Sequence, residues 1–253
     1  MMETSIINNC CVKNIAIFIP GRLYRNYSSI SKDIYSDTAK YDFSFLKLMK
    51  DFYKSLNINV YFFASLSKDC DIPMITYEFI NVMEMSNDLG ETKDHINIEE
   101  VICPSIIYSF VKRPETSYEN TYKMFYHYYK CFQMIEQYSK KHNVKFDVLI
   151  KWRTDISVET NCIQSFMEKT IEHFKQMKDN KNLYVPSHDL FWGISDQLAY
   201  GNYHCMNQYC NIIGNLINLC NGGIVYHPET LLGAHCSKLG LIIDTFDLIY
   251  KLL

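Results

Sequence analysis

One segment constrains the fold of this chain more than any other: Lys145-Phe-Asp-Val-Leu-Ile-Lys-Trp-Arg-Thr-Asp-Ile156. Its run from Phe146 to Ile150 is apolar on both faces of an extended strand, which is typical of a parallel sheet covered by helices. Arg153 and Asp155 follow at the carboxyl end, where open α/β sheets bind ligands. An arginine and a carboxylate in that place predict phosphate recognition beside a divalent metal. An ion pair that closes the strand is the alternative.

Composition restricts the class of protein. The chain has 253 residues, of which 48% are hydrophobic, enough for a packed core. Its formal net charge is -3, so no electrostatic field favours nucleic acid or an anionic membrane as a partner. The ten cysteines are scattered from Cys10 to Cys236 without a Cys-x-x-Cys pair, which favours reduced thiols and a cytoplasmic location.

The order of the segments predicts a mixed α/β fold with a mostly parallel sheet flanked by helices. An apolar run at 15–19, too short to span a membrane, reads as a first buried strand that Pro20-Gly21 ends. A helix then reaches Asn57, a C-cap, and strands follow at 58–64 and within 74–85. Aromatic residues at helical spacing predict a long core-facing helix over 122–142, ended by Asn143.

The second half of the chain continues the pattern. We expect a helix over 163–177, a short edge strand at 183–186 that ends in proline, and a helix over 203–220. The segment 191–201 reads as an irregular site loop or a helix start, and His227-Pro-Glu229 opens a last helix toward residue 239. His204, Cys205 and Cys210 could hold a metal, or the cysteines are incidental core residues. The whole of 1–253 is predicted to form one domain, with residues 1–14 as a polar N-terminal extension.

Four segments in this order carry a resemblance to a family. They are Met124-Phe125-Tyr126, Phe146-Asp147 through Arg153-Thr-Asp155, Gly193-Ile-Ser-Asp196-Gln197 and His227-Pro228-Glu229. With the first strand and Gly21-Arg22 they cover nearly the whole chain, and together it resembles small GT-A-type glycosyltransferase-like proteins of bacteria and large DNA viruses. The resemblance implies a Rossmann-like sheet that binds a UDP- or GDP-sugar, and transfer of one hexosyl or deoxyhexosyl unit to a hydroxyl of a glycan or glycoconjugate. If the chain is viral, its place is the host cytoplasm.

The resemblance also implies a divalent metal, Mn²⁺ or Mg²⁺, at an Asp-x-Asp site. Asp155 is the position carried over as ligand, and Arg153 stands where the first acid would be, so the guanidinium could take part of the phosphate contact. His227 is a further candidate ligand or diphosphate contact, with a turn residue as the alternative. Further donor contacts are expected from Gly21, Arg22 and Lys151, although surface cations are the ordinary reading of the two basic residues.

Transfer with inversion needs a group that accepts the proton of the acceptor hydroxyl, and a carboxylate suits this task. Asp196 is the first candidate and Glu229 the second. The alternative for Asp196 is a helix N-cap, which is compatible with a catalytic role. Trp152 could pack under a sugar or base, or simply lie in the core.

Two other functions stay open. A GT-A-like protein that binds a glycan or nucleotide without catalysis is favoured by the missing first acid of Asp-x-Asp. A sugar nucleotidyltransferase also uses a Rossmann-like sheet and a metal, but only Pro20-Gly21-Arg22 stands where such an enzyme has a glycine-rich loop with a lysine.

Overall fold

The computed structural model describes residues 12–21, 44–67, 80–86, 118–153, 156–177, 181–188, 190 and 192–252. The strands are β1 (Asn14–Gly21), β2 (Asn59–Ser67), β3 (Val82–Ser86), β4 (Val148–Trp152), β5 (Ile156–Ser157), β6 (Asn182–Pro186), β7 (Leu198–Asn202), β8 (Ile242–Phe246) and β9 (Lys251–Leu252). The helices are α1 (Ser44–Ser55), α5 (Tyr118–His142), α6 (Thr160–Gln176), α7 (Tyr203–Cys210), the 3₁₀ turn η2 (Asn211–Asn215), α8 (Leu216–Asn221) and α9 (Pro228–Lys238).

Seven of the strands form one mixed sheet in the order β3-β2-β1-β4-β7-β6-β8. β1 pairs in parallel with both β2 and β4, and β7 is antiparallel to its neighbours β4 and β6. The order of the strands reverses between β1 and β4, because the chain moves outward from β1 to β3 and then returns to the other side. In doubly wound sheets such a reversal opens a crevice at the carboxyl ends of the strands, where ligands bind.

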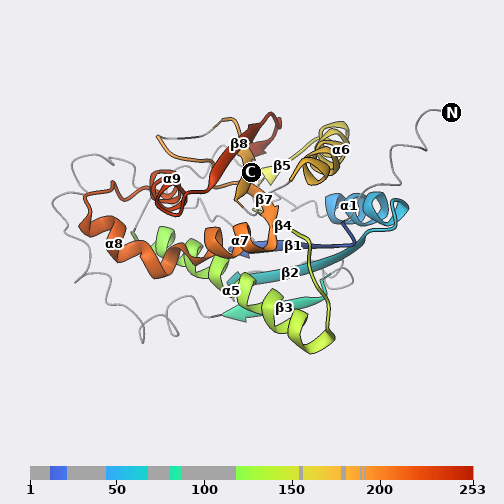
Figure 1. Ribbon diagram of the computed structural model, residues 1–253, viewed down its shortest axis with the longest axis horizontal. Coiled ribbons are helices and arrows are strands. Elements are labelled where there is room, and N and C mark those ends of the chain that lie inside the picture. The colour runs from blue at the N-terminus through green and yellow to red at the C-terminus, as the bar shows by residue number, and fades with distance from the viewer. Residues whose placement is uncertain are drawn as a thin grey trace, which may run out of the picture.

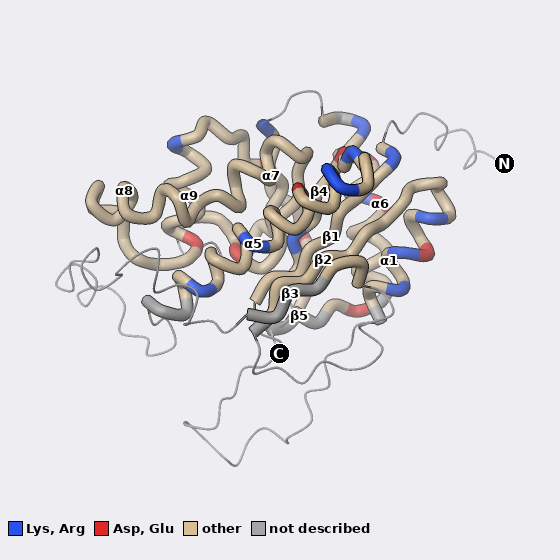
Figure 2. The backbone as a smooth tube through the Cα atoms, turned by 90° about the horizontal axis from the view of Figure 1, so that it is seen from below, with Lys and Arg blue, Asp and Glu red and all other residues tan. Residues whose placement is uncertain are grey.

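Helices cover both faces of this sheet (Figure 1). Along β1 the side chains alternate, so that Ile15, Ile17 and Ile19 face the layer with α1 and α6. Ala16 and Phe18 face the other layer, which contains α5, α7, η2, α8 and α9. Seen after a quarter turn, α1 and α6 lie on one side of the strands and α5 on the other (Figure 2). The predicted mixed sheet with flanking helices is therefore confirmed.

Several predicted ends of helices are confirmed by backbone geometry. Asn57 after α1 and Asn143 after α5 have positive φ angles of 60° and 53°, and Gly240 after α9 has a φ of 67°. Asparagine and glycine tolerate this left-handed conformation, which lets the chain turn away and satisfies the last carbonyls of each helix. The basic residues Lys140, Lys141 and His142 occupy the last turn of α5, as expected.

Three details of the prediction were wrong. β6 is an interior strand rather than an edge strand, because β8 from the carboxyl-terminal part of the chain pairs along its outer side as far as Pro186. Part of 191–201 belongs to the strand β7, which the sequence did not indicate. The helix expected over 203–220 is interrupted by η2 at 211–215, where Asn and Gly have low helix propensity.

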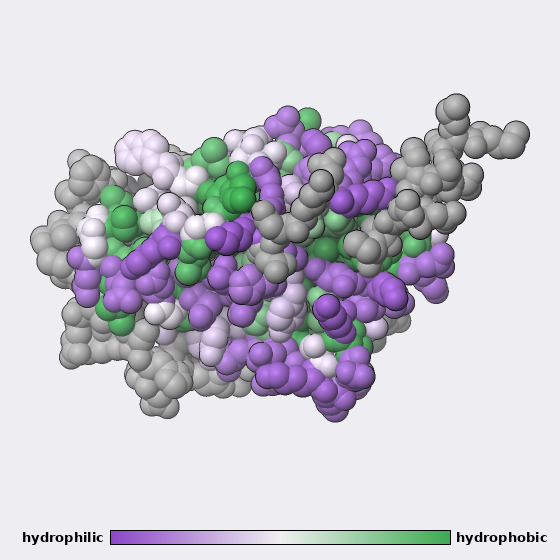
Figure 3. All heavy atoms as spheres, viewed as in Figure 1, coloured by the Kyte–Doolittle hydropathy of each residue, from purple (hydrophilic) through white to green (hydrophobic). Residues whose placement is uncertain are grey.

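The surface is mostly polar on the face shown in Figure 3, with hydrophobic residues in small patches between polar ones. None of the helices within the described ranges combines the length and apolar composition that a bilayer crossing requires.

Candidate active site at the carboxyl end of β4

Two geometric rules bring the site residues together. Along β4 the side chains of Leu149 and Lys151 face the layer of α5 and α7, and Arg153 follows directly after the strand. Because β7 is antiparallel to β4, the residues just before β7 meet the residues just after β4. The N–H of Arg153 accordingly donates to the carbonyl of Gln197 over 3.1 Å.

The centre of the site is an ion pair between Arg153 and Asp196. Nη1 of Arg153 donates to both carboxylate oxygens of Asp196, over 3.0 and 2.9 Å. The side chains are only 13% and 3% exposed, so the pair is largely shielded from water. The ion pair considered for the end of this strand joined Arg153 to Asp155, which lies outside the described residues; the pair in the structure joins Arg153 to Asp196.

Lys151 lies beneath this pair and is fully buried. Its ammonium donates to the main-chain carbonyl of Asp196, which also accepts from the hydroxyl of Tyr128 over 3.1 Å. Nζ lies 4.2 Å from the centre of the Tyr128 ring and 3.5 Å from the hydroxyl of Tyr209. Lys151 was expected to contact a phosphate or to be a surface cation; in the structure it supports Asp196 from inside the protein.

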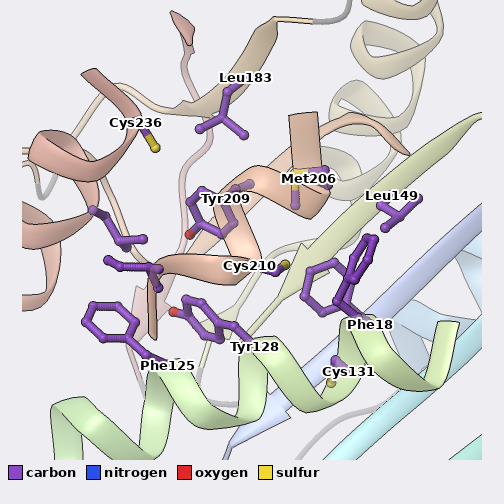
Figure 4. Close-up of a cluster of buried hydrophobic side chains, with 14 of the residues drawn as sticks. Phe18, Phe125, Tyr128, Cys131, Leu149, Leu183, Met206, Tyr209, Cys210 and Cys236 are labelled. Atoms are coloured by element: carbon purple, nitrogen blue, oxygen red, sulfur yellow. The ribbon is translucent and has the colours of Figure 1, made fainter. Parts of the chain in front are cut away.

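Tyr128 and Tyr209 stack on each other between α5 and α7, with ring centres 5.9 Å apart (Figure 4). Burial raises the pKa of both phenols well above the ordinary value, and the neighbouring Tyr209 and Asp196 add to this for Tyr128. Both hydroxyls therefore remain protonated at neutral pH; that of Tyr128 donates to the carbonyl of Asp196, and that of Tyr209 accepts from Lys151. Asp196 is held by Arg153 at its carboxylate, and by Lys151 and Tyr128 at its main chain.

The neighbours of Asp196 are also buried and polar. Ser195 is fully buried, and its hydroxyl donates to Oε1 of Gln197 over 2.6 Å. Asp196 does not cap a helix, because β7 follows it and Asn202 caps α7 by accepting from the N–H of Cys205. The N-cap alternative for Asp196 is thus wrong.

The start of α9 packs directly against the segment that leads to Asp196. The N–H of Ile194 donates to the carbonyl of Glu229 over 3.1 Å. A Cβ added at Gly193 would lie 1.8 Å from that carbonyl oxygen, and one at Gly233 would lie 2.9 Å from the Cα of Gly193. The two glycines therefore allow a backbone contact that no larger residue permits without a shift of the chain.

Glu229, in the first turn of α9, is buried and pairs with His227. Nδ1 of His227 and Oε2 of Glu229 are 2.6 Å apart, with side chains 17% and 7% exposed. The contact is close enough for an ion pair, but its angles are not those of a hydrogen bond. The Glu229 carboxylate also raises the pKa of Tyr128, although less than burial does. Asp196 and Glu229 therefore both act on the same buried phenol.

The remaining candidates divide into three groups: one at the edge of the sheet, two outside the described residues and three in the core. Gly21 ends β1 with a φ of 109°, at the same edge of the sheet as Arg153. Arg22 and Asp155 lie outside the described residues, and within those residues no group of three or more His, Cys, Asp or Glu side chains could hold a metal ion. Cys205 and Cys210 are buried in the core, and Trp152 is a core residue stacked on Phe45.

Sequence reasoning missed Tyr128 and Tyr209 as members of the site. Both lie at core-facing positions of their helices, and only their hydroxyls distinguish them from other aromatic core residues. A buried Tyr hydroxyl needs a polar partner, and a lysine in the middle of an apolar strand needs one too. That shared need was the signal that could have connected them to Lys151.

No family model matches this chain, and a search of curated proteins gives no match either.

Proposed function

We propose that the protein is a GT-A-type glycosyltransferase that transfers a monosaccharide from a UDP- or GDP-sugar to a hydroxyl of a glycan or glycoconjugate. One observation carries this proposal. The segments around Arg153, Asp196 and Glu229 are far apart in the sequence, yet they contact one another at the carboxyl end of β4. This place adjoins the reversal of strand order between β1 and β4, where doubly wound sheets bind nucleotides.

In this proposal Arg153 contacts the diphosphate of the donor. Its guanidinium is more exposed than the buried ammonium of Lys151, and Asp196 fixes its orientation through two contacts. Departure of the nucleoside diphosphate puts negative charge on a phosphate oxygen, and a cation held in advance stabilises that charge without reorganisation. Asp196 is then a positioning residue, because both of its carboxylate oxygens accept from Arg153.

The proton of the acceptor hydroxyl passes to the imidazole of His227, with the carboxylate of Glu229 beside it. His227 is the more exposed member of the pair and is therefore assigned to the acceptor hydroxyl, while the buried carboxylate of Glu229 stabilises the imidazolium that forms. We favour His227, supported by Glu229, over Asp196 as the base, because the carboxylate of Asp196 accepts from Arg153.

The charges of the described residues support a role for a divalent cation. Lys151 and Arg153 carry two positive charges, and Asp196 and Glu229 carry two negative ones, so a bound diphosphate would add uncompensated negative charge. Mn²⁺ or Mg²⁺ with Asp155 as ligand would neutralise it when bound. His227 as a second metal ligand is the competing role for that histidine.

A second function is favoured by the same ion pair. Because Arg153 and Asp196 neutralise each other, a protein that binds a nucleotide without turning it over would keep this geometry. Nucleotide binding without hydrolysis or transfer would identify that function.

The test combines binding with turnover. UDP and GDP are titrated into the protein by calorimetry with and without Mn²⁺, and release of nucleoside diphosphate is followed from a panel of UDP- and GDP-sugars. We expect one nucleotide to bind and its sugar to be hydrolysed. Failure of both nucleotides to bind the folded protein would refute the proposal.

The His227→Gln variant separates the two roles of His227. If His227 is the base, the variant turns over slowly at saturating Mn²⁺ and needs no more Mn²⁺ than the parent. If it is a metal ligand, the Mn²⁺ dependence shifts instead. His142→Gln, at an exposed position in the last turn of α5, is the matched control and should behave as the parent does.

A further inference from the structure

Trp192 is the one exposed Trp, Tyr or Phe side chain among the residues whose burial the structure describes, with 91% of its surface accessible. The other tryptophan, Trp152, is 1% exposed and packed in the core. An indole in water is unfavourable compared with a buried one, so its position calls for a reason.

The backbone of Trp192 adds to this cost. Its φ is 61°, in the left-handed region that favours glycine and disfavours large side chains. Burial of the indole does not offset this strain, because the side chain is exposed. Strained positions of this kind concentrate at functional sites and ligand clamps.

Backbone hydrogen bonds hold the two residues after Trp192, and one of these bonds also belongs to the candidate site. The N–H of Gly193 donates to the carbonyl of Leu190 over 2.5 Å, and the next N–H, of Ile194, donates to the carbonyl of Glu229. Trp192 therefore stands directly beside an anchored backbone. It lies four positions before Asp196, a distance of at most about 14 Å along the chain.

We propose that Trp192 is a stacking platform for a sugar ring of the acceptor glycan. This inference rests on the proposed function and adds the acceptor subsite to it. The C–H face of a pyranose packs on an indole, while its hydroxyls stay in water, and the negative face of the ring system attracts the polarised C–H groups.

The size of the platform favours a sugar over a protein partner. A Trp side chain buries about 150–250 Å² at most, whereas each partner of a stable protein interface buries about 800 Å². One indole suits a single ring and is far too small for an interface with a second copy of the chain.

The two tryptophans make the test specific. Iodide quenches the fluorescence of exposed Trp192 but not that of buried Trp152, and the Trp152→Phe variant removes the buried signal altogether. The probes are the methyl β-glycosides of glucose, galactose and N-acetylglucosamine and methyl α-mannoside, each titrated in the presence of iodide. We expect at least one of them to protect Trp192 from quenching.

Variants establish whether the indole itself binds. Trp192→Ala should weaken binding of that glycoside, measured by calorimetry, about tenfold, whereas Trp192→Phe should restore most of it. Ile249→Ala changes another exposed apolar side chain and should leave binding as in the parent. Lack of protection by every glycoside, equal affinity of Trp192→Ala and the parent, or protection caused by self-association in sedimentation would each overturn the inference.

The proposed function is read separately. Binding of UDP or GDP to Trp192→Ala should match the parent, because the nucleotide lies at β4. If the parent binds nucleotide but no glycoside protects Trp192, only the stacking platform is refuted. If the parent binds neither UDP nor GDP, the proposed function is refuted.

Discussion

The Asp196→Asn substitution removes one buried charge from the centre of the site and almost no volume. Arg153, whose side chain is 13% exposed, then loses the charge of its partner Asp196, while the main-chain contacts of residue 196 to Lys151 and Tyr128 remain. Breaking one side of a buried pair costs about 3–5 kcal/mol. Coulomb's law with an effective dielectric constant of 20 gives about 4 kcal/mol for unit charges at 4 Å, which is the same size. We therefore expect the free energy of unfolding to fall by about 3 kcal/mol.

A double-mutant cycle assigns this loss to the pair. Arg153→Met should destabilise by a similar amount, and the double variant by much less than the sum, with a coupling of about 2–3 kcal/mol. Urea unfolding at pH 7, followed by circular dichroism with slopes compared between variants, measures all four corners. Glu168→Gln, at an exposed carboxylate of α6, is the control. Single losses below about 0.5 kcal/mol with no coupling would refute the reasoning, because surface changes have effects of that size.

Three further predictions concern other parts of the structure. Gly193→Ala should destabilise by about 1–3 kcal/mol or more in urea unfolding, since its Cβ would meet the Glu229 carbonyl, whereas Gly214→Ala should not; equal effects would contradict the close packing of α9. Burial lowers the pKa of His235, so the unfolded chain takes up a proton near about pH 6.5 that the folded protein does not. Stability should therefore fall as the pH drops below that value, and a His235→Gln variant should show a flatter dependence between pH 7.5 and 5.5; parallel curves would rule this out. Trp192→Gly should raise the unfolding free energy by up to about 1 kcal/mol, because glycine relieves the positive φ; a clear loss of stability would argue against strain.

Many of the helices and strands could be predicted from the sequence, because they follow from local periodicity. The apolar run of β1, the aromatic stripe of α5 and the buried strand β4 each have one dominant pattern, and the ends at Asn57, Asn143 and Gly240 have turn chemistry. The position of Arg153 at the carboxyl end of a central strand followed from the same reasoning. These are properties of short segments.

The ion pair between Arg153 and Asp196 could not be predicted from the sequence, because it depends on distant parts of the chain. β7 contains Gly201 and Asn202, which weaken a strand pattern, and its antiparallel course is set by its neighbours β4 and β6. Without that strand nothing directs Asp196 toward Arg153. The alternation of side chains along β4 predicts that Lys151 is buried. Lysine is rarely buried, however, and this general tendency favoured the wrong prediction of a surface cation.

The pair of His227 and Glu229 shows the same limit on a smaller scale. The sequence marks the start of a helix there, since Pro228 stands at its first position. The approach of that helix to Gly193 requires two glycines 40 residues apart, Gly193 and Gly233, whose roles appear only when the backbones are in contact. Close backbone contacts leave no periodic signal.

The central claim is that a nucleoside diphosphate binds where β4, the segment before β7 and the start of α9 meet. Hydrogen–deuterium exchange of the protein with and without saturating UDP or GDP and Mn²⁺ tests it directly. We predict slower exchange in peptides that cover 151–153, 193–197 and 227–230, with little change in α6 and α8. Unchanged exchange in all three segments, or protection confined to a different part of the protein, would contradict the claim.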